Sequence, residues 1–182
     1  MQLLTMIENV WLILAALGIS NVVEQIDRYV FQVSPIPFIE YDSYQYSLLA
    51  GTLFSVVYCV GVILFSLLNE KVKLDRITIV ALSCGISSIA LACIPFVTQF
   101  WHLAVLRLFM GFAQSPITVF CASFIKDQFV EEKRGIAFGI FNSGTFIGFA
   151  LSLTLGTAFY DSAGWKAAYL FFGGVGILYA II

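Results

Sequence analysis

The sequence predicts an all-α integral membrane protein with six transmembrane helices, and three observations support this fold class. The 182-residue chain is 60% hydrophobic, and only 11% of its residues are charged. Its mean hydropathy of +0.97 is more than a soluble domain of this length could hide in a core. Its apolar residues also fall into six runs separated by short polar loops, and a helix that spans a bilayer needs about 20 such residues.

Each run predicts one helix, because backbone N–H and C=O groups in hydrocarbon must be satisfied within their own segment. The first run lacks the basic start and cleavage site of a signal peptide, so it should remain as a spanning helix. The sixth run is the shortest and ends without a flanking charge, so we expect a truncated product or part of a longer protein. The predicted spans are Val10–Gln32, Tyr46–Leu68, Ile77–Phe96, His102–Ile125, Gly135–Phe159 and Ala167–Ile182.

Loop charge predicts the orientation of these helices. Basic residues gather in the second and fourth loops, whereas the first and third loops have none and the fifth has only Lys166. Since Lys and Arg accumulate on the cytoplasmic side, these two loops and the N-terminus should be cytoplasmic. The basic residues of the two loops are Lys71, Lys73, Arg76, Lys126, Lys133 and Arg134.

Composition also narrows the function classes. The net charge of −2 gives no indication of a nucleic-acid partner. The four cysteines lie inside apolar runs, the chain has one histidine, and no metal-ligand spacing occurs, so we expect buried thiols and no metal or cofactor. No carboxylate pair, nucleophile with a base or phosphate-binding loop is present, which predicts that the chain is not an enzyme.

The fourth run carries polar residues that a lipid-facing helix would not tolerate. At about 100° per residue, Arg107, Gly111, Gln114 and Thr118 share one side of the helix, with Ser115 beside them. An ionised side chain at this depth is costly unless it faces protein or water. The stripe therefore predicts a lined cavity, and a proline at position 116 predicts a bend beside it.

The first run places acids at a similar depth. Its polar residues lie within about 100° of arc, with Asp27 at the edge, roughly 8 Å below the outer end like Arg107. Two interpretations remain open: a switchable charge cluster that couples a proton to transport, or a structural arrangement. In the structural alternative, Glu24 pairs with Arg28 at i,i+4 while Asp27 and Arg107 hold the two helices together. The residues of the arc are Asn21, Glu24, Gln25 and Arg28.

Two uncharged polar residues and one face of small residues also stand out in the apolar runs. Gln114 and Asn142 are equally suited to interhelical hydrogen bonds and to substrate contacts. The fifth run has small residues at every fourth position, which predicts a face where two helix backbones approach closely. These small residues are Gly144, Gly148, Ser152 and Gly156.

Three motifs in the expected order resemble the N-terminal half of the major facilitator superfamily. They are the charged loop from Ser66 to Lys73, Arg107-x-x-x-Gly111, and Gly164-Trp165-Lys166-Ala-Ala-Tyr169. Within that superfamily, the string Asn21-x5-Asp27-Arg28-Tyr29 and the loop Lys126-Asp-Gln-Phe resemble Spinster-like transporters. The resemblance implies a single bundle over residues 1–182 that forms half of a twelve-helix secondary transporter.

The resemblance also implies roles for individual residues. Asp27 and Arg107 would act in coupling and substrate handling, while Gln114 departs from the glutamate that Spinster-like proteins carry there. Glu70 and Lys71 would form a cytoplasmic gating contact, with a simple positive-inside anchor as the alternative.

The same resemblance implies the solute and the partners. The solute would be small or amphipathic, such as a lysolipid or an organic anion, carried by alternating access. The partners would be membrane lipid and either the C-terminal six-helix half or a second membrane subunit. The rival interpretation is a non-transporting scaffold subunit of a larger membrane complex.

Overall fold

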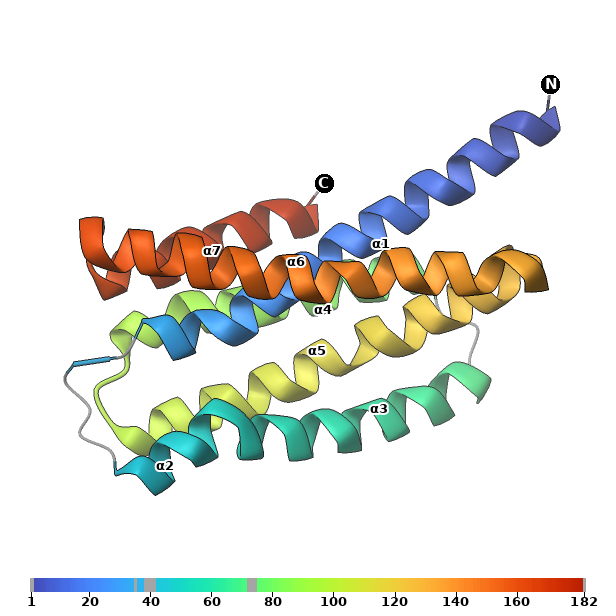
Figure 1. Ribbon diagram of the computed structural model, residues 1–182. Coiled ribbons are helices and arrows are strands. Elements are labelled where there is room, and N and C mark those ends of the chain that lie inside the picture. The colour runs from blue at the N-terminus through green and yellow to red at the C-terminus, as the bar shows by residue number, and fades with distance from the viewer. Residues whose placement is uncertain (1, 35, 38–41, 72–74, 182) are drawn as a thin grey trace.

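The computed structural model describes residues 2–34, 36–37, 42–71 and 75–181, and this part of the chain is helical without strands (Figure 1). Five helices are long and apolar enough to cross a membrane, and a shorter apolar helix, Trp165–Ile181, follows them. The predicted fold class is therefore confirmed. The helices are α1 (Gln2–Val33), α2 (Ser43–Ser47), α3 (Leu53–Lys71), α4 (Arg76–Cys93), α5 (Phe100–Gln128), α6 (Glu131–Ala163) and α7 (Trp165–Ile181).

The second predicted span begins with an irregular segment. The short helix α2 runs into a π-helical turn, Leu48–Thr52, before α3 begins. The side-chain oxygen of Gln45 accepts a hydrogen bond from the backbone N–H of Asp42 at 3.2 Å, which satisfies one of the donors that a helix start leaves open. The π-turn carries an extra residue that rotates the preceding turn relative to α3.

A proline lies inside α5 at position 116. Proline has no N–H, so the carbonyl of Phe112, four residues earlier, loses its usual helical donor. The hydroxyl of Ser115 donates to that carbonyl at 2.7 Å. The helix therefore continues through Pro116 without leaving the carbonyl unsatisfied at membrane depth.

The spanning helices pack in three main pairs: α1 with α6, α3 with α5, and α4 with α7. In Figure 1, α6 lies across α1, and α5 runs beside α3. A Cβ atom at Gly144 would lie 2.8 Å from the backbone oxygen of Gly18, and one at Gly148 would lie 2.6 Å from that of Val22. The small-residue face predicted for this helix is thus confirmed as the contact with α1.

In the α3–α5 and α4–α7 pairs, glycines also let the two helix backbones approach closely. A Cβ atom at Gly111 of α5 would lie 2.7 Å from the backbone oxygen of Phe54 in α3. One at Gly173 of α7 would lie 2.8 Å from the oxygen of Ser88 in α4. Close backbone approach therefore holds each pair together.

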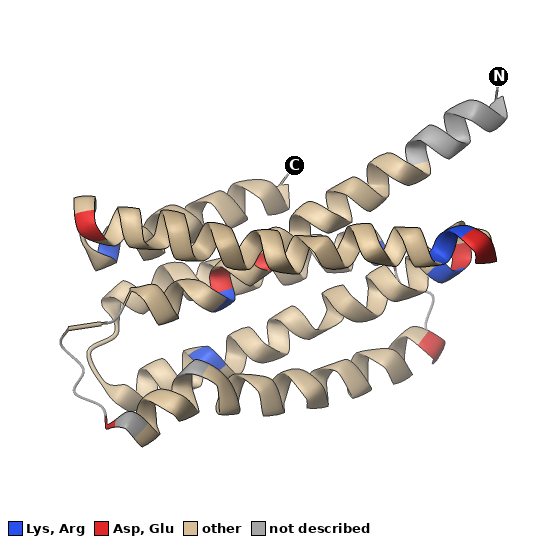
Figure 2. Ribbon diagram, in the orientation of Figure 1, with Lys and Arg blue, Asp and Glu red and all other residues tan. Residues whose placement is uncertain are grey.

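Charged side chains gather at the helix ends, with a few exceptions inside α1 and α5 (Figure 2). Two apolar clusters fill the interior on either side of these exceptions. Val30 and Met110 belong to the first cluster, and Val23 and Ile117 belong to the second. Between these positions lie Glu24, Gln25, Asp27 and Arg28 of α1 and Gln114 of α5. Arg107, one turn before Met110, packs against Phe31 of the first cluster, and together these residues form a polar layer inside the bundle.

Candidate functional site

This polar layer is almost completely buried. The exposed fractions are 3% for Glu24, 0% for Asp27, 1% for Arg107 and 0% for Gln114. Each of these side chains also has at least one polar atom without a hydrogen-bond partner among the described residues. Buried polar groups are usually satisfied, so such a concentration marks a site that stability alone does not explain.

Asp27 faces α4. Its Oδ2 atom accepts a hydrogen bond from the hydroxyl of Ser88 at 2.7 Å, and its Oδ1 atom has no partner in the described chain. The expected pairing with Arg107 is wrong, because the only ion pair within 4.0 Å among the described residues joins Arg76 and Asp127. The helical arc placed Asp27 at its edge, and this edge faces α4.

Arg107 packs against an aromatic ring. Its guanidinium carbon lies 4.0 Å from the ring centre of Phe31, a distance at which the π face attracts the cation. Its Nη1 atom donates to the backbone oxygen of Arg28 at 3.4 Å. Its Nε and Nη2 atoms find no acceptor in the described part of the chain.

Arg28 points to α3. Its guanidinium carbon lies 4.4 Å from the ring centre of Phe54 and 5.0 Å from that of Tyr58. The alternative in which Glu24 pairs with Arg28 is therefore also wrong for the described residues, where no such ion pair forms. Instead, the amide of Gln114 donates to the backbone oxygen of Glu24 at 3.5 Å, which connects α5 to α1.

Three further polar residues lie on α1, α5 and α6. One of them connects two helices, and the other two are exposed. Asn21 donates to the backbone oxygen of Phe141 at 2.8 Å and to Thr145 at 3.2 Å, so it ties α1 to α6. The hydroxyl of Thr118 is exposed and lies 2.6 Å from that of Tyr58. Asn142 is exposed on α6, away from the buried layer.

Sequence reasoning missed the partners of this layer. Ser88 and Tyr58 were not among the expected site residues, although both contact members of the layer or lie beside them. A signal for the first was present, because Ser87 and Ser88 interrupt the apolar run of the third span. Hydroxyl groups in a spanning helix commonly bond to a neighbouring helix.

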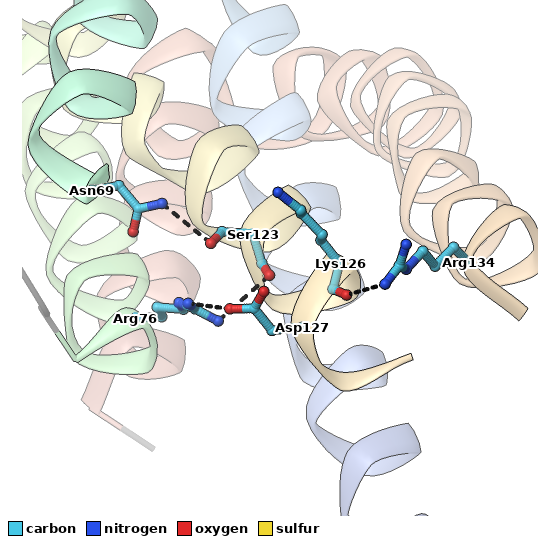
Figure 3. A network of polar contacts seen from close by, with 6 residues as sticks. All are labelled: Asn69, Arg76, Ser123, Lys126, Asp127 and Arg134. Carbon is cyan, nitrogen blue, oxygen red and sulfur yellow. Dashed lines mark hydrogen bonds and ion pairs between the residues drawn. The ribbon is translucent and has the colours of Figure 1, made fainter. Parts of the chain in front are cut away.

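The end of the bundle that carries the α3–α4 and α5–α6 loops holds a second polar network (Figure 3). An ion pair joins Arg76 to Asp127 at 2.5 Å, and the amide of Asn69 donates to Ser123 at 3.1 Å. Glu70 and Lys71, the predicted gating residues, are exposed beside this network. Lys73 lies outside the described residues.

Arg134, in the first turn of α6, ties the start of this helix to the end of α5. It donates to the backbone oxygens of Lys126 at 2.8 Å and Phe129 at 3.1 Å. These oxygens belong to the last turn of α5 and to its C-cap residue, where carbonyls have no helical donors. Among the described residues, no group of three or more His, Cys, Asp or Glu side chains is arranged to hold a metal ion.

Two solved structures have a similar fold. Both are of a bacterial homolog of the human lysosomal transporter Spinster, in inward-facing form. The structure described as occupied has a TM-score of 0.82 and 24% sequence identity, and the match covers 93% of this chain and 42% of that one. The structure described as unoccupied has a TM-score of 0.80 and 22% identity, with 94% and 42% covered.

A curated relative is the probable L-galactonate transporter of Escherichia coli K12. It is 31% identical over 85 residues, which are 47% of this chain and 19% of the relative. The chain thus spans less than half the length of each of these proteins. The family model of the Major Facilitator Superfamily matches residues 9–182. Because this match covers nearly the whole sequence, the chain belongs to the Major Facilitator Superfamily of membrane transporters.

Proposed function

We propose that the chain is the N-terminal half of a secondary active transporter that moves a small or amphipathic organic anion by alternating access. The observation that carries the proposal is the buried polar layer, in which Glu24, Asp27 and Arg107 lie inside the bundle without an ion-pair partner among the described residues. Transporters of this type bind their substrates near the bilayer midplane, between two helical halves. The second half would be a C-terminal six-helix bundle or a second copy of this chain.

The free-energy cost of burying ionisable side chains supports a functional role for the polar layer. Ionisable side chains inside a membrane are expensive and commonly mark substrate or ion pathways. Arg107 retains two nitrogen atoms without acceptors in the described chain, Nε and Nη2. A guanidinium presents paired donors that match a carboxylate or a phosphate, so an anionic group is the ligand chemistry that fits best.

The aromatic side chains beside the two arginines support the proposal that the solute is amphipathic. Phe31 packs against Arg107, while Phe54 and Tyr58 pack against Arg28, so both cations lie beside apolar ring faces. Such surfaces suit a solute that has both a charged group and a carbon skeleton. The name of one relative agrees with an anionic solute, since galactonate is a carboxylate.

The carboxyl groups are the candidates for coupling. Glu24 and Asp27 are the two acids of the layer, and each has one oxygen without a partner in the described chain. Coupling to protons would require one of them to gain and lose a proton as the substrate binds. Asp27 is held by Ser88, whereas the backbone of Glu24 is held by the neutral amide of Gln114. We propose both residues, together with Arg28, as coupling or binding residues.

The proposal also assigns a membrane orientation to the chain and a gating role to the loop end of the bundle. The basic second and fourth loops would be cytoplasmic, which places the N-terminus on that side as well. Glu70 and Lys71 would contact the second half at this end of the bundle. Asn142, exposed on α6, would be available to the solute or to that half.

Uptake by the chain reconstituted with its complementary half tests the proposal. Radiolabelled galactonate and a lysophospholipid would be compared in vesicles that contain the parent, Arg107→Ala or Asp27→Asn proteins. We expect both variants to lose uptake, while Lys133→Gln, an exposed charge change in the first turn of α6, keeps it. Uptake at the parent rate in both variants would show that the layer does not handle substrate.

The same experiment distinguishes the alternative in which the chain is a non-transporting scaffold subunit. A chain that copurifies in a large membrane complex and supports no uptake with any complementary half would favour that alternative.

A further inference from the structure

A separate pocket opens at the loop end of the bundle, between α3, α5 and α6. Its volume is about 560 Å³, which is within the range of ligand pockets in proteins. Four residues of the polar network in Figure 3, Asn69, Ser123, Lys126 and Arg134, line it, and no residue of the buried layer does. Its polar lining residues are Ser66, Asn69, Glu70, Thr118, Ser123, Lys126 and Arg134.

The charges of this pocket are not balanced. Two cations, Lys126 and Arg134, face one acid, Glu70, and none of the three forms an ion pair within the described chain. The nearby Arg76 differs, because Asp127 neutralises it at 2.5 Å. The pocket therefore has a net charge of one positive unit.

The two cations are held in different ways. Arg134 donates to two backbone oxygens, those of Lys126 and Phe129, so its guanidinium is oriented without being neutralised. The ammonium of Lys126 has no acceptor among the described residues. A fixed cation and an adjustable cation on neighbouring helices can meet an anionic group from two sides.

The pocket also connects to the buried layer through hydroxyl groups. Thr118 lines the pocket and lies 2.6 Å from the hydroxyl of Tyr58. The ring of Tyr58 lies 5.0 Å from the guanidinium carbon of Arg28. These contacts link the pocket to Arg28 through one pair of hydroxyl groups and one aromatic ring.

We propose that this pocket is a second anion-binding site, where Lys126 and Arg134 hold the carboxylate or phosphate of an organic anion at the loop end of its path. The identity of the anion as the transported solute rests on the proposed function, but binding to the pocket does not. Hydroxyl and amide groups of Ser123 and Asn69 supply neutral donors beside the two cations. Glu70 opposes binding and limits its strength, which suits a site that the solute must leave.

Chemical protection of Lys126 tests the site directly. The complete chain in detergent would be treated with an amine-reactive ester, and the labelling of each lysine would be followed by peptide mass spectrometry. Galactonate and glycerol 3-phosphate are the anionic probes, and galactitol is the neutral control. At a probe concentration of about twice its Kd, labelling of Lys126 should slow about threefold, the factor 1 + [L]/Kd.

Lys133 supplies an internal reference, because it is an exposed lysine in the nearby first turn of α6 and does not line the pocket. Its labelling should be unchanged by either anion. Protection of both lysines to the same extent, or of neither, would overturn the proposal. In that case Arg134 only caps α5 and Lys126 only anchors the loop.

Two variants with opposite effects keep the test independent of folding. Arg134→Gln should reduce the protection of Lys126 by galactonate, and Glu70→Gln should increase it. A variant pair that shifts protection in one direction only would indicate a structural disturbance and contradict the proposal.

Arg28→Gln separates this site from the proposed transport function. We expect it to abolish uptake and to leave the protection of Lys126 intact. Protection without uptake in the parent protein would contradict the transport proposal alone. Uptake without protection would contradict the second site alone.

Discussion

The two polar regions of the molecule treat their charges in opposite ways. At the loop end, Arg76 is ion-paired with Asp127 at 2.5 Å, and both side chains are partly exposed, at 30% and 46%. Inside the bundle, Asp27 and Arg107 are buried and have no ion-pair partner within the described residues. Pairing therefore occurs where water makes it least valuable and is missing where the low dielectric makes an isolated charge most costly.

This difference in charge pairing indicates a different role for the loop end and for the interior of the bundle. An exposed ion pair contributes little to stability, so the loop-end pair mainly fixes α4 against α5. A buried charge without a partner is retained at a cost that packing must offset. The glycine contacts between α1 and α6 supply such packing. Four changes break or sharpen this contrast, from the largest expected effect to the smallest.

Replacement of Arg107 by methionine should have the largest effect, on transport and not on folding. Loss of one charge-assisted contact of about 1.5–3 kcal/mol would reduce uptake by at least about tenfold. Stability should be unchanged or higher, because the change also removes the desolvation cost of a buried charge that has no ion-pair partner among the described residues. Vesicle uptake and thermal unfolding in detergent measure the two effects, with Arg107→Lys as the charge-preserving control. A variant that transports normally but unfolds at a lower temperature would make Arg107 a structural residue.

Replacement of Gly148 by valine tests the packing that holds the layer. Its Cβ atom would lie 2.6 Å from the backbone oxygen of Val22, so the α1–α6 pair must separate. We expect destabilisation by about 1–3 kcal/mol or more. The matched control is Gly139→Val on the same helix, where a Cβ atom meets nothing within 4 Å. Equal unfolding temperatures for the two variants would exclude close α1–α6 packing as a source of stability.

Replacement of Ser88 by alanine removes the hydrogen bond that Asp27 accepts. Interhelical hydrogen bonds in membranes average about 0.6 kcal/mol and reach about 1.7. Ser143→Ala is the control, because the Ser143 hydroxyl donates to the backbone oxygen of Ile140 in its own helix. Chemical unfolding of both variants measures the difference. If Ser143→Ala costs as much, the bond from Ser88 to Asp27 does not hold α4 against α1.

Replacement of Asp127 by asparagine should have the smallest effect. A partly exposed ion pair is worth about 0.2–1 kcal/mol, and salt screens it. The loss of stability should therefore be visible at low ionic strength and fade at high ionic strength. Unfolding curves at two salt concentrations measure it. A large loss that is independent of salt would mean that the loop-end pair acts as a buried contact.

Hydropathy was sufficient to predict the fold class and the helices. The predicted span Gly135–Phe159 lies inside α6, which runs from Glu131 to Ala163. The helix extends further because polar residues such as Glu131 continue it beyond the hydrocarbon, where hydropathy carries no signal. The π-turn at Leu48–Thr52 also has no signature in composition.

The contacts of the site were not predictable to the same extent. Helical periodicity identifies which residues share a face of one helix, but it does not identify the helix that lies opposite. Asp27 and Arg107 have similar depths, yet Asp27 turns to Ser88 of α4. The buried members of the layer were found because polar residues in apolar runs are visible in the sequence. Their roles in binding and coupling stay predictions.

The pairing order of the helices has a consequence for synthesis of the protein. Main partners are distant in the chain, since α1 packs with α6, and the hydrogen bond from Asn21 to Phe141 spans 120 positions. Chains are made from the N-terminus, so α1 enters the membrane before its partner exists. Its acids, Glu24 and Asp27, must wait for α4, α5 and α6 before protein surrounds them. We therefore expect the packing around the first helix to be completed only after α6 has been made.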